Sequence, residues 1–244
     1  MQKGFFEFVK NYQPDILCLQ ETKAFETQLP AEFKYMMKDY GYVRHSGTKP
    51  WYAGTAIFFK EKPLEVRNTF EEQYFHEDGR TIEVKYSEFT LLNLYVPNWW
   101  DRADGREMLT YKLEFYEKLI KYANSLRDKW ENVIMCGDFN IAHTEIDIAR
   151  PKENKDSIWF LPIEREMMTK LISNWYIDCF RHFNPGVKDH YTRRSYRAGA
   201  RPKNVWRRID YFFVSDNFIK NVKKIIHHTD IFGSDHCPIS LEIS

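Results

Sequence analysis

The stretch at residues 132–140, NVIMCGDFN, constrains the fold more than any other part of the chain. It begins with a short apolar run that has the length and β-branched content of a buried strand. Gly137 then breaks the run, and Asp138 and Asn140 follow with one aromatic residue between them. Polar side chains at the end of a buried strand commonly face a cleft, although an ordinary strand-to-turn link is the alternative for this stretch alone. The stretch therefore predicts a core strand that ends at a functional site.

The composition excludes several classes of protein. The 36 Lys and Arg residues nearly balance the 35 Asp and Glu residues, so a nucleic-acid partner would have to bind a local basic patch. The four cysteines lie far apart without a CxxC pair, which argues against a zinc site or a disulfide framework and favours a reducing compartment. No apolar run has transmembrane length and no signal peptide is visible. We expect a cytoplasmic, intracellular protein with no membrane partner.

Hydrophobic periodicity predicts an α/β chain that folds as one domain with layered sheets over residues 1–244. Helices are expected at residues 1–12, 109–126, 162–175 and 216–222, and Ile163 is expected to face inward on the third of these. Strands are expected at residues 15–19, 54–59, 81–86, 89–95, 133–136, 209–214, 224–228 and 239–243. The segments at 81–86 and 89–95 should form an antiparallel pair, the first with one wet face.

Polar groups that suit phosphodiester hydrolysis recur at the predicted strand ends. Glu21 follows one strand as Asp138 follows another, and carboxylate oxygens are ligands that Mg²⁺ prefers, although each of these acids alone could be an ordinary surface group. Hydrolysis needs a cation to offset charge, an oriented water and help for the leaving oxygen. A serine hydrolase is disfavoured because no G-x-S-x-G motif occurs. The residues that share this placement are Glu21, Asp138, Asn140, Asp210, Asp235 and His236.

A local basic patch is present at residues 181–208. Nine of its side chains are basic and one, Asp189, is acidic, with aromatic residues interleaved. Such a segment is typical of a surface that binds a nucleic-acid backbone, although a solvated charged loop is the alternative. Trp99 and Trp100 lie in a second polar loop beside Arg102 and Arg106, where they could stack on bases or fold back onto the core.

Six motifs together resemble the exonuclease III and abasic-site endonuclease family of the endonuclease/exonuclease/phosphatase superfamily, closest to its archaeal-type members. They occur in the family's order and cover nearly the whole chain: LQETK at 19–23, YVPN at 95–98, GDFN at 137–140, RPKEN at 150–154, RIDYFFVS at 208–215 and GSDHCPI at 233–239. The resemblance implies a four-layer α/β sandwich of two packed mixed sheets flanked by helices, as in DNase I. It also implies a monomeric, Mg²⁺-dependent hydrolase for DNA repair, with Mn²⁺ as an alternative ion.

The resemblance further implies cleavage of double-stranded DNA on the 5′ side of abasic sites, with possible 3′→5′ exonuclease or 3′-phosphodiesterase action at damaged ends. The implied DNA substrate is associated with the nucleoid. Motif by motif, it makes Asp138 the residue that orients or deprotonates water, and Asn140 and His236 the phosphate-binding groups. The other implied roles are catalytic for Asp210 and Tyr95, metal-binding for Glu21 and Asp235, and DNA-binding for Asn98, Arg80, Arg150, Asn154, Arg193, Arg207 and Lys23.

Two departures from the family pattern bear on function. The chain begins at the family's first helix and apparently lacks the family's first N-terminal strand, either because the sequence is truncated or because the protein has no such strand. Its absence would leave neighbouring strands without a ladder partner and the cation short of a ligand. Arg193 and Arg207 stand where the family has aromatic residues that line the pocket for the abasic sugar, and arginine keeps a flat face but adds charge. A catalytically weak DNA-binding paralogue and a phosphodiesterase for another phosphate ester are the alternative functions.

Overall fold

The computed structural model describes residues 4–23, 33, 35, 37–48, 52–68, 77–98, 105–194 and 206–244. Trp99 and Trp100, with Arg102, and the middle of the basic segment (195–205) lie outside the described residues. The described elements are α1 (Phe5–Tyr12), β1 (Ile16–Leu19), β2 (Gly41–His45), β3 (Thr55–Phe59), β4 (Glu65–Arg67), β5 (Thr81–Lys85), β6 (Thr90–Tyr95), α4 (Gly105–Arg127), β7 (Val133–Asp138), η3 (Glu145–Asp147), α5 (Pro151–Asn154), α6 (Pro162–Ser173), β8 (Tyr176–Asp178), α7 (Cys179–Phe183), β9 (Asp210–Ser215), η5 (Asp216–Asn221), β10 (Val222–His227) and β11 (Ile239–Ile243).

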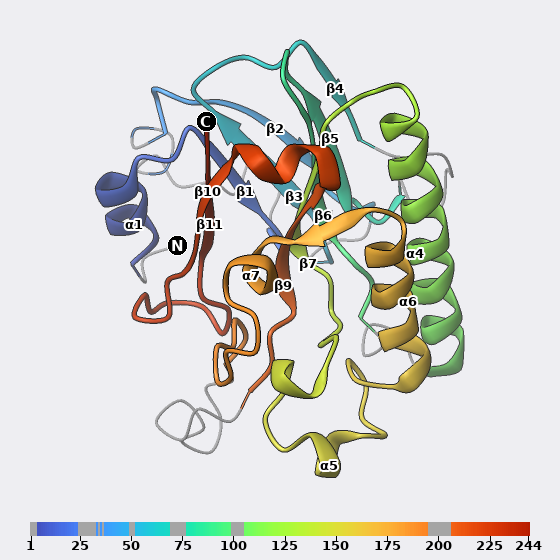
Figure 1. The fold of residues 1–244 in the computed structure, drawn as a ribbon. Coiled ribbons are helices and arrows are strands. Elements are labelled where there is room, and N and C mark those ends of the chain that lie inside the picture. Colours follow the sequence, from blue (N-terminus) through green and yellow to red (C-terminus); the bar gives the residue numbers. More distant parts are fainter. Residues whose placement is uncertain are drawn as a thin grey trace.

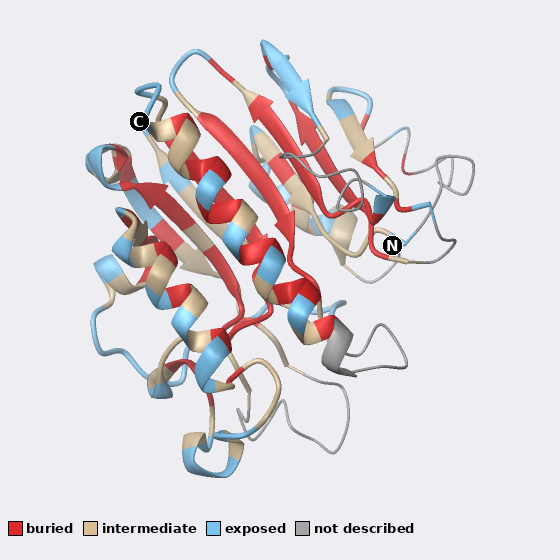
Figure 2. Cartoon of the chain, turned by 90° about the vertical axis from the view of Figure 1, so that its right-hand side faces the viewer, coloured by how far each residue is buried: buried red, intermediate tan, exposed pale blue. Residues whose placement is uncertain are grey.

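A six-stranded mixed sheet forms the centre of the molecule. Its strand order is β4-β5-β6-β7-β9-β8, and the β6–β7 pair is parallel while the other pairs are antiparallel. The helices α4 and α6 lie side by side against one face of this sheet (Figures 1 and 2). Their inward side chains, such as Phe115 and Met168, pack on Met135 and Phe213 of the sheet. Figure 2 shows the alternation of buried and exposed residues along both helices that this one-sided packing produces.

Two smaller sheets cover the opposite face of the central sheet. One has the order β1-β3-β2 and the other is the β10–β11 pair. Ile57 and Ile225 of these small sheets share a buried cluster with Ile82, Ile134 and Val214 of the central sheet. The outer side of the three-stranded sheet is covered by α1, which lies at the edge of the molecule away from α4 and α6 (Figure 1). The prediction of packed sheets flanked by helices is therefore confirmed.

A buried asparagine joins the central sheet to the three-stranded sheet by directional bonds. Asn93 of β6 is fully buried, and its side-chain amide donates to the carbonyls of Leu19 (3.1 Å) and Ala56 (2.9 Å). Its own amide oxygen accepts a hydrogen bond from Gln20 Nε2 at 2.6 Å. Buried amides need all of these partners, so the two sheets can pack in only one alignment here. This alignment fixes the residues that follow Gln20.

Some local predictions were wrong. The segment at 81–85 has no wet face: Glu83 is buried because the Tyr122 hydroxyl of α4 donates to its carboxylate at 2.6 Å. Ile163 is exposed rather than inward, because it lies in the first turn of α6 just after Pro162. The short strands β2 and β4 were missed, and the segment after β9 is a 3-10 helix.

The edges of β1 and β11 bear on the expected absence of a first strand. Within the described ranges, β1 pairs with β3 alone and β11 pairs with β10 alone. The three-stranded and two-stranded sheets are therefore not hydrogen-bonded into one layer. The assignment of a single domain lacking the family's first strand stays a prediction.

Candidate active site

Asp138 lies at the end of β7 in a position that only the preceding glycine allows. Gly137 has a φ of 129°, and a Cβ there would lie 2.0 Å from the Leu94 carbonyl oxygen of the neighbouring strand. The close approach pairs Tyr95 with Asp138 across β6 and β7. Asp138 is 3% exposed, and its two carboxylate oxygens accept from the backbone N–H (2.9 Å) and the side-chain amide (3.1 Å) of Asn140. Burial, with the charges of Asp210 and Glu21, raises the pKa of Asp138 to about 7 against the opposing effects of His236 and the Asn140 N–H.

His236 is held against a second carboxylate on the next strand. Asp210 of β9 is the direct cross-strand partner of Asp138, and both of its oxygens lie 2.9 Å from His236 Nδ1. The buried Thr192 hydroxyl accepts from the Asp210 backbone N–H at 3.1 Å and fixes the start of β9. Burial alone would lower the pKa of His236, but the charge and hydrogen bond of Asp210, followed by Asp138 and Asp235, raise it to about 10. A protonated His236 donates from both ring nitrogens, so Nε2–H remains for a substrate oxygen.

Glu21 approaches from the small sheet. The backbone N–H groups of Thr22 and Lys23 each donate at 3.1 Å to the carbonyls of Gly54 and Ala53, which holds the turn after β1 on the turn before β3. Lys23 Nζ forms an ion pair with the Glu21 carboxylate. Burial alone would raise the pKa of Glu21, but the hydrogen bond and charge of Lys23, followed by His236 and the Tyr95 hydroxyl, lower it overall.

Glu21, Asp138 and His236 meet as a group that could hold a metal ion. One ligand atom from each lies within 4.8 Å of the others. The two carboxylates suit a hard divalent cation such as Mg²⁺, and the raised pKa of buried Asp138 reflects negative charge that a cation would offset. The donor set therefore fits a Mg²⁺ ion through Glu21 and Asp138. The imidazole of His236 fits that ion less well, because Asp210 already holds the ring in its protonated form.

Arg80 lies in the interior of the protein. Its side chain is fully buried in this structure, and its contact with the DNA backbone stays a prediction. Its guanidinium donates to Asp78 (3.0 Å) and to the Tyr52 hydroxyl (2.6 Å), and lies 4.9 Å from the ring centroid of Tyr95. The tertiary fold satisfies this arginine internally, which the short DGR sequence did not indicate. Arg80 supports Tyr95, whose hydroxyl in turn bonds Glu21.

The other predicted DNA-binding residues lie at or near the surface. Asn98 is partly buried, and its amide oxygen has no hydrogen-bond partner among the residues that the structure describes. Arg150 precedes α5 in a left-handed conformation and forms an exposed ion pair with Glu153 at 3.5 Å. Asn154 caps this turn by donating to the carbonyls of Ala149 (3.0 Å) and Arg150 (3.1 Å). The RPKEN segment is therefore a surface turn held by side-chain hydrogen bonds.

Arg193 and Arg207 lie next to each other beside His236. Isolated β-bridges pair Arg193 with both Arg207 and His236. Trp159, which the sequence reasoning did not single out, packs on both arginines: its ring centroid lies 3.9 Å from Arg207 Cζ and 5.4 Å from Arg193 Cζ. Asp235 forms an ion pair with Arg193 at 3.5 Å and is not part of the three-residue metal group. The ion pair with Arg193 would therefore compete with a metal ion for the Asp235 carboxylate.

Two arginines of the basic segment serve the fold instead of a surface. Arg208 is fully buried and pairs with Asp147 (2.8 Å) and Asp178 (2.7 Å). Arg181 also pairs with Asp147. The acids that neutralise these two arginines lie outside the segment in sequence, so the local excess of positive charge overstated the free positive charge in space.

A buried lysine supports the Asn140 turn and was missed from the sequence. Lys112 of α4 is fully buried, and its ammonium donates to the Asn140 carbonyl (2.7 Å) and to the Glu164 carboxylate (2.6 Å). Burial lowers the pKa of Lys112 against the opposing effect of Glu164. The only sequence signal was a charged residue on the otherwise apolar stripe of the helix at 109–126.

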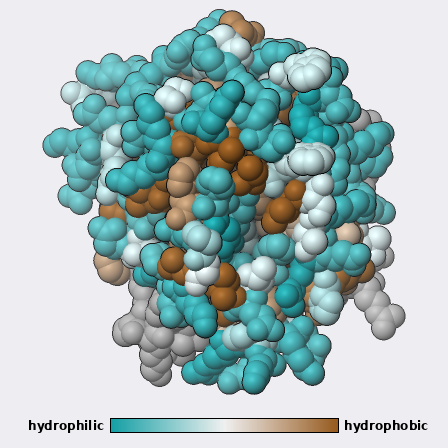
Figure 3. Space-filling view, viewed as in Figure 1, coloured by the Kyte–Doolittle hydropathy of each residue, from teal (hydrophilic) through white to brown (hydrophobic). Residues whose placement is uncertain are grey.

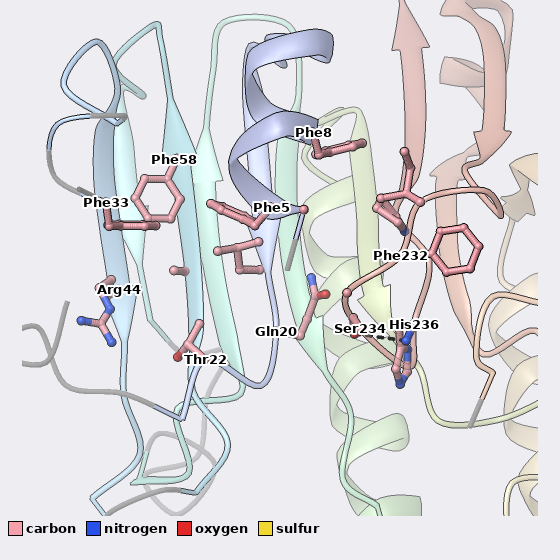
Figure 4. Close-up of a pocket in the computed structure, with 16 residues that line it drawn as sticks. Phe5, Phe8, Gln20, Thr22, Phe33, Arg44, Phe58, Phe232, Ser234 and His236 are labelled. Atoms are coloured by element: carbon pink, nitrogen blue, oxygen red, sulfur yellow. Dashed lines mark hydrogen bonds between the residues drawn. The ribbon is translucent and has the colours of Figure 1, made fainter. Parts of the chain in front are cut away.

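An apolar cavity of about 310 Å³ adjoins His236 between α1 and the small sheets (Figure 4). Phe5, Phe33, Phe58 and Phe232 form its walls, and Gln20, Thr22 and His236 lie at its polar end. Figure 3 shows apolar side chains gathered near the middle of the face that is turned to the viewer, among hydrophilic ones. The cavity therefore gives His236 an apolar neighbourhood on one side.

The comparisons with known proteins agree on one family. The model of the endonuclease/exonuclease/phosphatase family matches residues 2–236. The chain is 36% identical to an exodeoxyribonuclease of Bacillus subtilis over 240 residues, which is 98% of this chain and 92% of the relative. An AP endonuclease structure from Archaeoglobus fulgidus superposes with a TM-score of 0.86 at 26% identity, over 98% of this chain and 92% of that one. The structure of a Neisseria 3′ phosphatase bound to a product DNA hairpin superposes with a TM-score of 0.86 at 25% identity, over 98% of this chain and 92% of that one.

No helix in the described part of the chain is both long and apolar enough to cross a bilayer.

Proposed function

Because the chain belongs to the endonuclease/exonuclease/phosphatase family, we propose that it is a metal-dependent DNA-repair nuclease that cleaves the phosphodiester 5′ to abasic sites and at damaged 3′ ends. The observation that carries the proposal is the meeting of Glu21, Asp138 and His236 within 4.8 Å. Relatives named as an exodeoxyribonuclease and an AP endonuclease support the substrate class. The proposed substrate is duplex DNA inside the cell, and the proposed acting form is a monomer.

The side chains divide the hydrolysis between them. Asp138, held by Asn140 and buried, takes the proton of the attacking water or orients it toward phosphorus. His236, held by Asp210, donates a hydrogen bond from Nε2 to a non-bridging phosphate oxygen whose charge grows in the transition state. Asn140 binds the phosphate on the same side, and Tyr95 steadies Glu21. The water oxygen joins phosphorus while the bond from phosphorus to the 3′ oxygen breaks, and the 3′ oxygen takes up a proton to leave as a hydroxyl group.

Glu21 and Asp138 are the proposed ligands for Mg²⁺, with Mn²⁺ as an alternative ion. When bound, the ion supplies positive charge that offsets the negative charge of the phosphate oxygens and assists the departing oxygen. Lys23 keeps the Glu21 carboxylate ionised before the ion binds. Lys23, Asn98, Arg150 and Asn154 are proposed to contact the DNA backbone around the site.

Cleavage of a labelled duplex with one abasic-site analogue tests this function, beside an undamaged duplex, with Mg²⁺ and with EDTA. We expect nicking 5′ to the lesion that requires Mg²⁺. Asp138→Asn should still bind the duplex while its cleavage rate falls about a hundredfold or more. Asp128→Asn, a change to an exposed carboxylate, is the matched control and should cleave normally.

Three outcomes would contradict the proposal. Full activity of Asp138→Asn would remove Asp138 from the chemistry. Binding without nicking by the wild type would indicate a non-catalytic DNA-binding paralogue. Hydrolysis of a soluble phosphate ester that duplex DNA does not inhibit, even at low salt, would indicate another substrate for the same centre.

A further inference from the structure

A buried chain of contacts joins the outer helix α4 to the carboxylate of Glu21. It starts at Tyr111 of α4, whose hydroxyl donates to Asp78 at 2.9 Å, and the same Asp78 oxygen accepts from Arg80 Nε at 3.0 Å. The Arg80 guanidinium lies 4.9 Å from the ring centroid of Tyr95, and the Tyr95 hydroxyl donates to Glu21. Because Glu21 is a proposed ligand of the metal ion, this chain of contacts ends at the hydrolytic centre.

All three nitrogen atoms of the Arg80 guanidinium have acceptors inside the protein. Besides the bond from Nε to Asp78, Nη1 donates to the Tyr95 carbonyl at 3.4 Å and Nη2 donates to the Tyr52 hydroxyl at 2.6 Å. The Arg80 carbonyl in turn accepts from the Tyr95 backbone N–H at 2.8 Å. The arginine therefore holds Tyr95 both by its backbone and by its ring, and a DNA phosphate could bind this guanidinium only by displacing one of these acceptors.

The turn that carries Asp78 and Arg80 is fixed by close packing. Gly79 lies between them with a φ of 65°, and a Cβ there would lie 2.4 Å from the backbone nitrogen of Gly47. The Gly79 carbonyl accepts from the Thr55 hydroxyl of β3 at 3.1 Å. The two charged side chains therefore start from a backbone that is packed against the three-stranded sheet, the same sheet from which Glu21 approaches the site.

The energetics of burial favour an orienting role for the pair of Arg80 and Asp78. Their side chains are 0% and 8% exposed, so both charges have lost most of their hydration. The attraction between two buried charges roughly offsets that loss, and apolar side chains of similar volume often fill such a site at equal or lower free energy. The planar guanidinium adds donors at fixed angles, which an apolar side chain lacks. Its specific contribution is therefore the placement of Tyr95.

We propose that Tyr111 and Asp78 are positioning residues of the nuclease, which act through Arg80 on a ligand of the metal ion. Arg80, held in place by both, keeps the Tyr95 hydroxyl against Glu21 and so limits the movement of that carboxylate. The inference rests on the proposed nuclease function and adds two residues, neither of which touches the substrate, to the group on which metal binding depends. This role differs from a contact with the DNA backbone, which would act on DNA affinity and on its salt dependence.

Two tyrosines of α4 provide a matched test. The Tyr122 hydroxyl also donates to a buried carboxylate, that of Glu83 at 2.6 Å, but lies about three helical turns further along α4. In cleavage of the abasic duplex, Tyr111→Phe should raise the Mg²⁺ concentration for half-maximal rate about fivefold, the equivalent of one lost hydrogen bond, and leave KM for the duplex unchanged. Tyr122→Phe should keep the wild-type titration. Thermal melting should show a similar loss of stability in both variants, so a general loosening of α4 would act equally on both.

The route through Tyr95 has its own test. In a Tyr95→Phe background the hydroxyl that reaches Glu21 is missing, so adding Tyr111→Phe should shift the Mg²⁺ titration no further. In the otherwise wild-type chain, Asp78→Asn removes the counter-ion of Arg80 and should shift the titration in the same direction as Tyr111→Phe. Asp78→Asn also provides the readout if Tyr111→Phe does not fold.

The outcomes separate the positioning role from the nuclease function. An unchanged Mg²⁺ titration in Tyr111→Phe, an equal shift in Tyr122→Phe, or a full additional shift in the Tyr95→Phe background would overturn the positioning role alone. A higher KM for the duplex and a weaker salt dependence in Tyr111→Phe, at an unchanged Mg²⁺ titration, would overturn it in favour of a DNA-backbone contact by Arg80. A wild type that cleaves no abasic duplex with Mg²⁺ would overturn the proposed function, and the inference with it.

Discussion

Asp138 and Asp210 are direct cross-strand partners on β7 and β9, and His236 Nδ1 lies 2.9 Å from both oxygens of the second acid. Two carboxylates at neighbouring positions would repel each other, and the protonated His236 compensates that charge. The two carboxylates therefore have different roles, which their surroundings determine. Asp210 holds His236 in the protonated form, while Asp138 has the raised pKa suited to accept a proton.

Asp210→Asn should change the pH profile of cleavage. Without the charge of Asp210, the pKa of His236 falls from about 10 toward its ordinary value of about 6.5. His236 would then lose its proton as the pH rises through neutrality, so cleavage should decline above about pH 7, where wild-type His236 stays protonated. The measurement is kcat against pH at saturating Mg²⁺. A uniform drop with no change in profile would leave Asp210 with a purely structural role.

Glu21→Gln should weaken metal binding more than DNA binding. The amide keeps the size of the side chain and removes one anionic ligand, so the Mg²⁺ concentration for half-maximal cleavage should rise about tenfold or more. A Mg²⁺ titration of the cleavage rate measures this. Glu153→Gln removes an exposed carboxylate and should leave the titration unchanged; an identical curve for Glu21→Gln would exclude it as a ligand.

Gly137→Ala should destabilise the protein strongly. The new Cβ would lie 2.0 Å from the Leu94 carbonyl oxygen at a φ of 129°, so clash and strain together predict a loss of about 3 kcal/mol in the free energy of unfolding. Urea unfolding measures it. Gly186→Ala is the control: it also has a positive φ, 74°, but no atom within 4 Å, and should cost about 1 kcal/mol. Similar losses in both variants would show that the clash is relieved.

Lys112 and Glu164 should behave as one unit. Both side chains are fully buried, so Lys112→Met alone leaves an unpaired carboxylate and should cost about 3–5 kcal/mol of unfolding free energy. The double variant Lys112→Met, Glu164→Leu removes both charges and should recover part of that loss. Strict additivity in the double-mutant cycle would mean that the two charges do not interact.

Asp147 should make the fold sensitive to acid. Burial alone would raise its pKa, but Arg208 and Arg181 lower it well below the ordinary value. The stabilisation is therefore fully present above the unfolded pKa of about 3.9 and is lost as the pH falls through the lower folded value. Unfolding free energies measured from pH 7 downward should show this slope in the wild type and a shallower one in Asp147→Asn. The exposed Asp156→Asn is the control and should keep the wild-type slope.

The sequence predicted the residues that would act on the substrate better than the buried residues that hold them in place. Asp138 and His236 could be found because each follows a strong local signal, an apolar strand or a short turn, and because several motifs occur in one order. Lys112 and Thr192 could not, since each acts through a hydrogen bond to a residue far away in sequence. Local pattern contains no information about which distant carbonyl a buried donor reaches.

The arginines show that the sequence can also indicate a binding role for residues that the fold buries. Arg80 matches a DNA-contact position of the family and Arg208 belongs to the basic segment at 181–208, yet both are fully buried against acids and tyrosines. Trp159 had no motif at all and became relevant only because folding brings it onto Arg207. Charge in sequence predicts a binding surface only where folding supplies no internal partner.

Activity should depend on the alignment of the small sheet with the central sheet, which the buried Asn93 fixes. Glu21 reaches the hydrolytic centre from the small sheet and Asp138 from the central one, and the Gln20–Asn93 bond at 2.6 Å precedes Glu21 by a single residue. A slip between the layers would separate the two carboxylates while every strand ladder stayed intact. On warming, the protein should therefore become inactive at a lower temperature than the one at which its strands and helices melt.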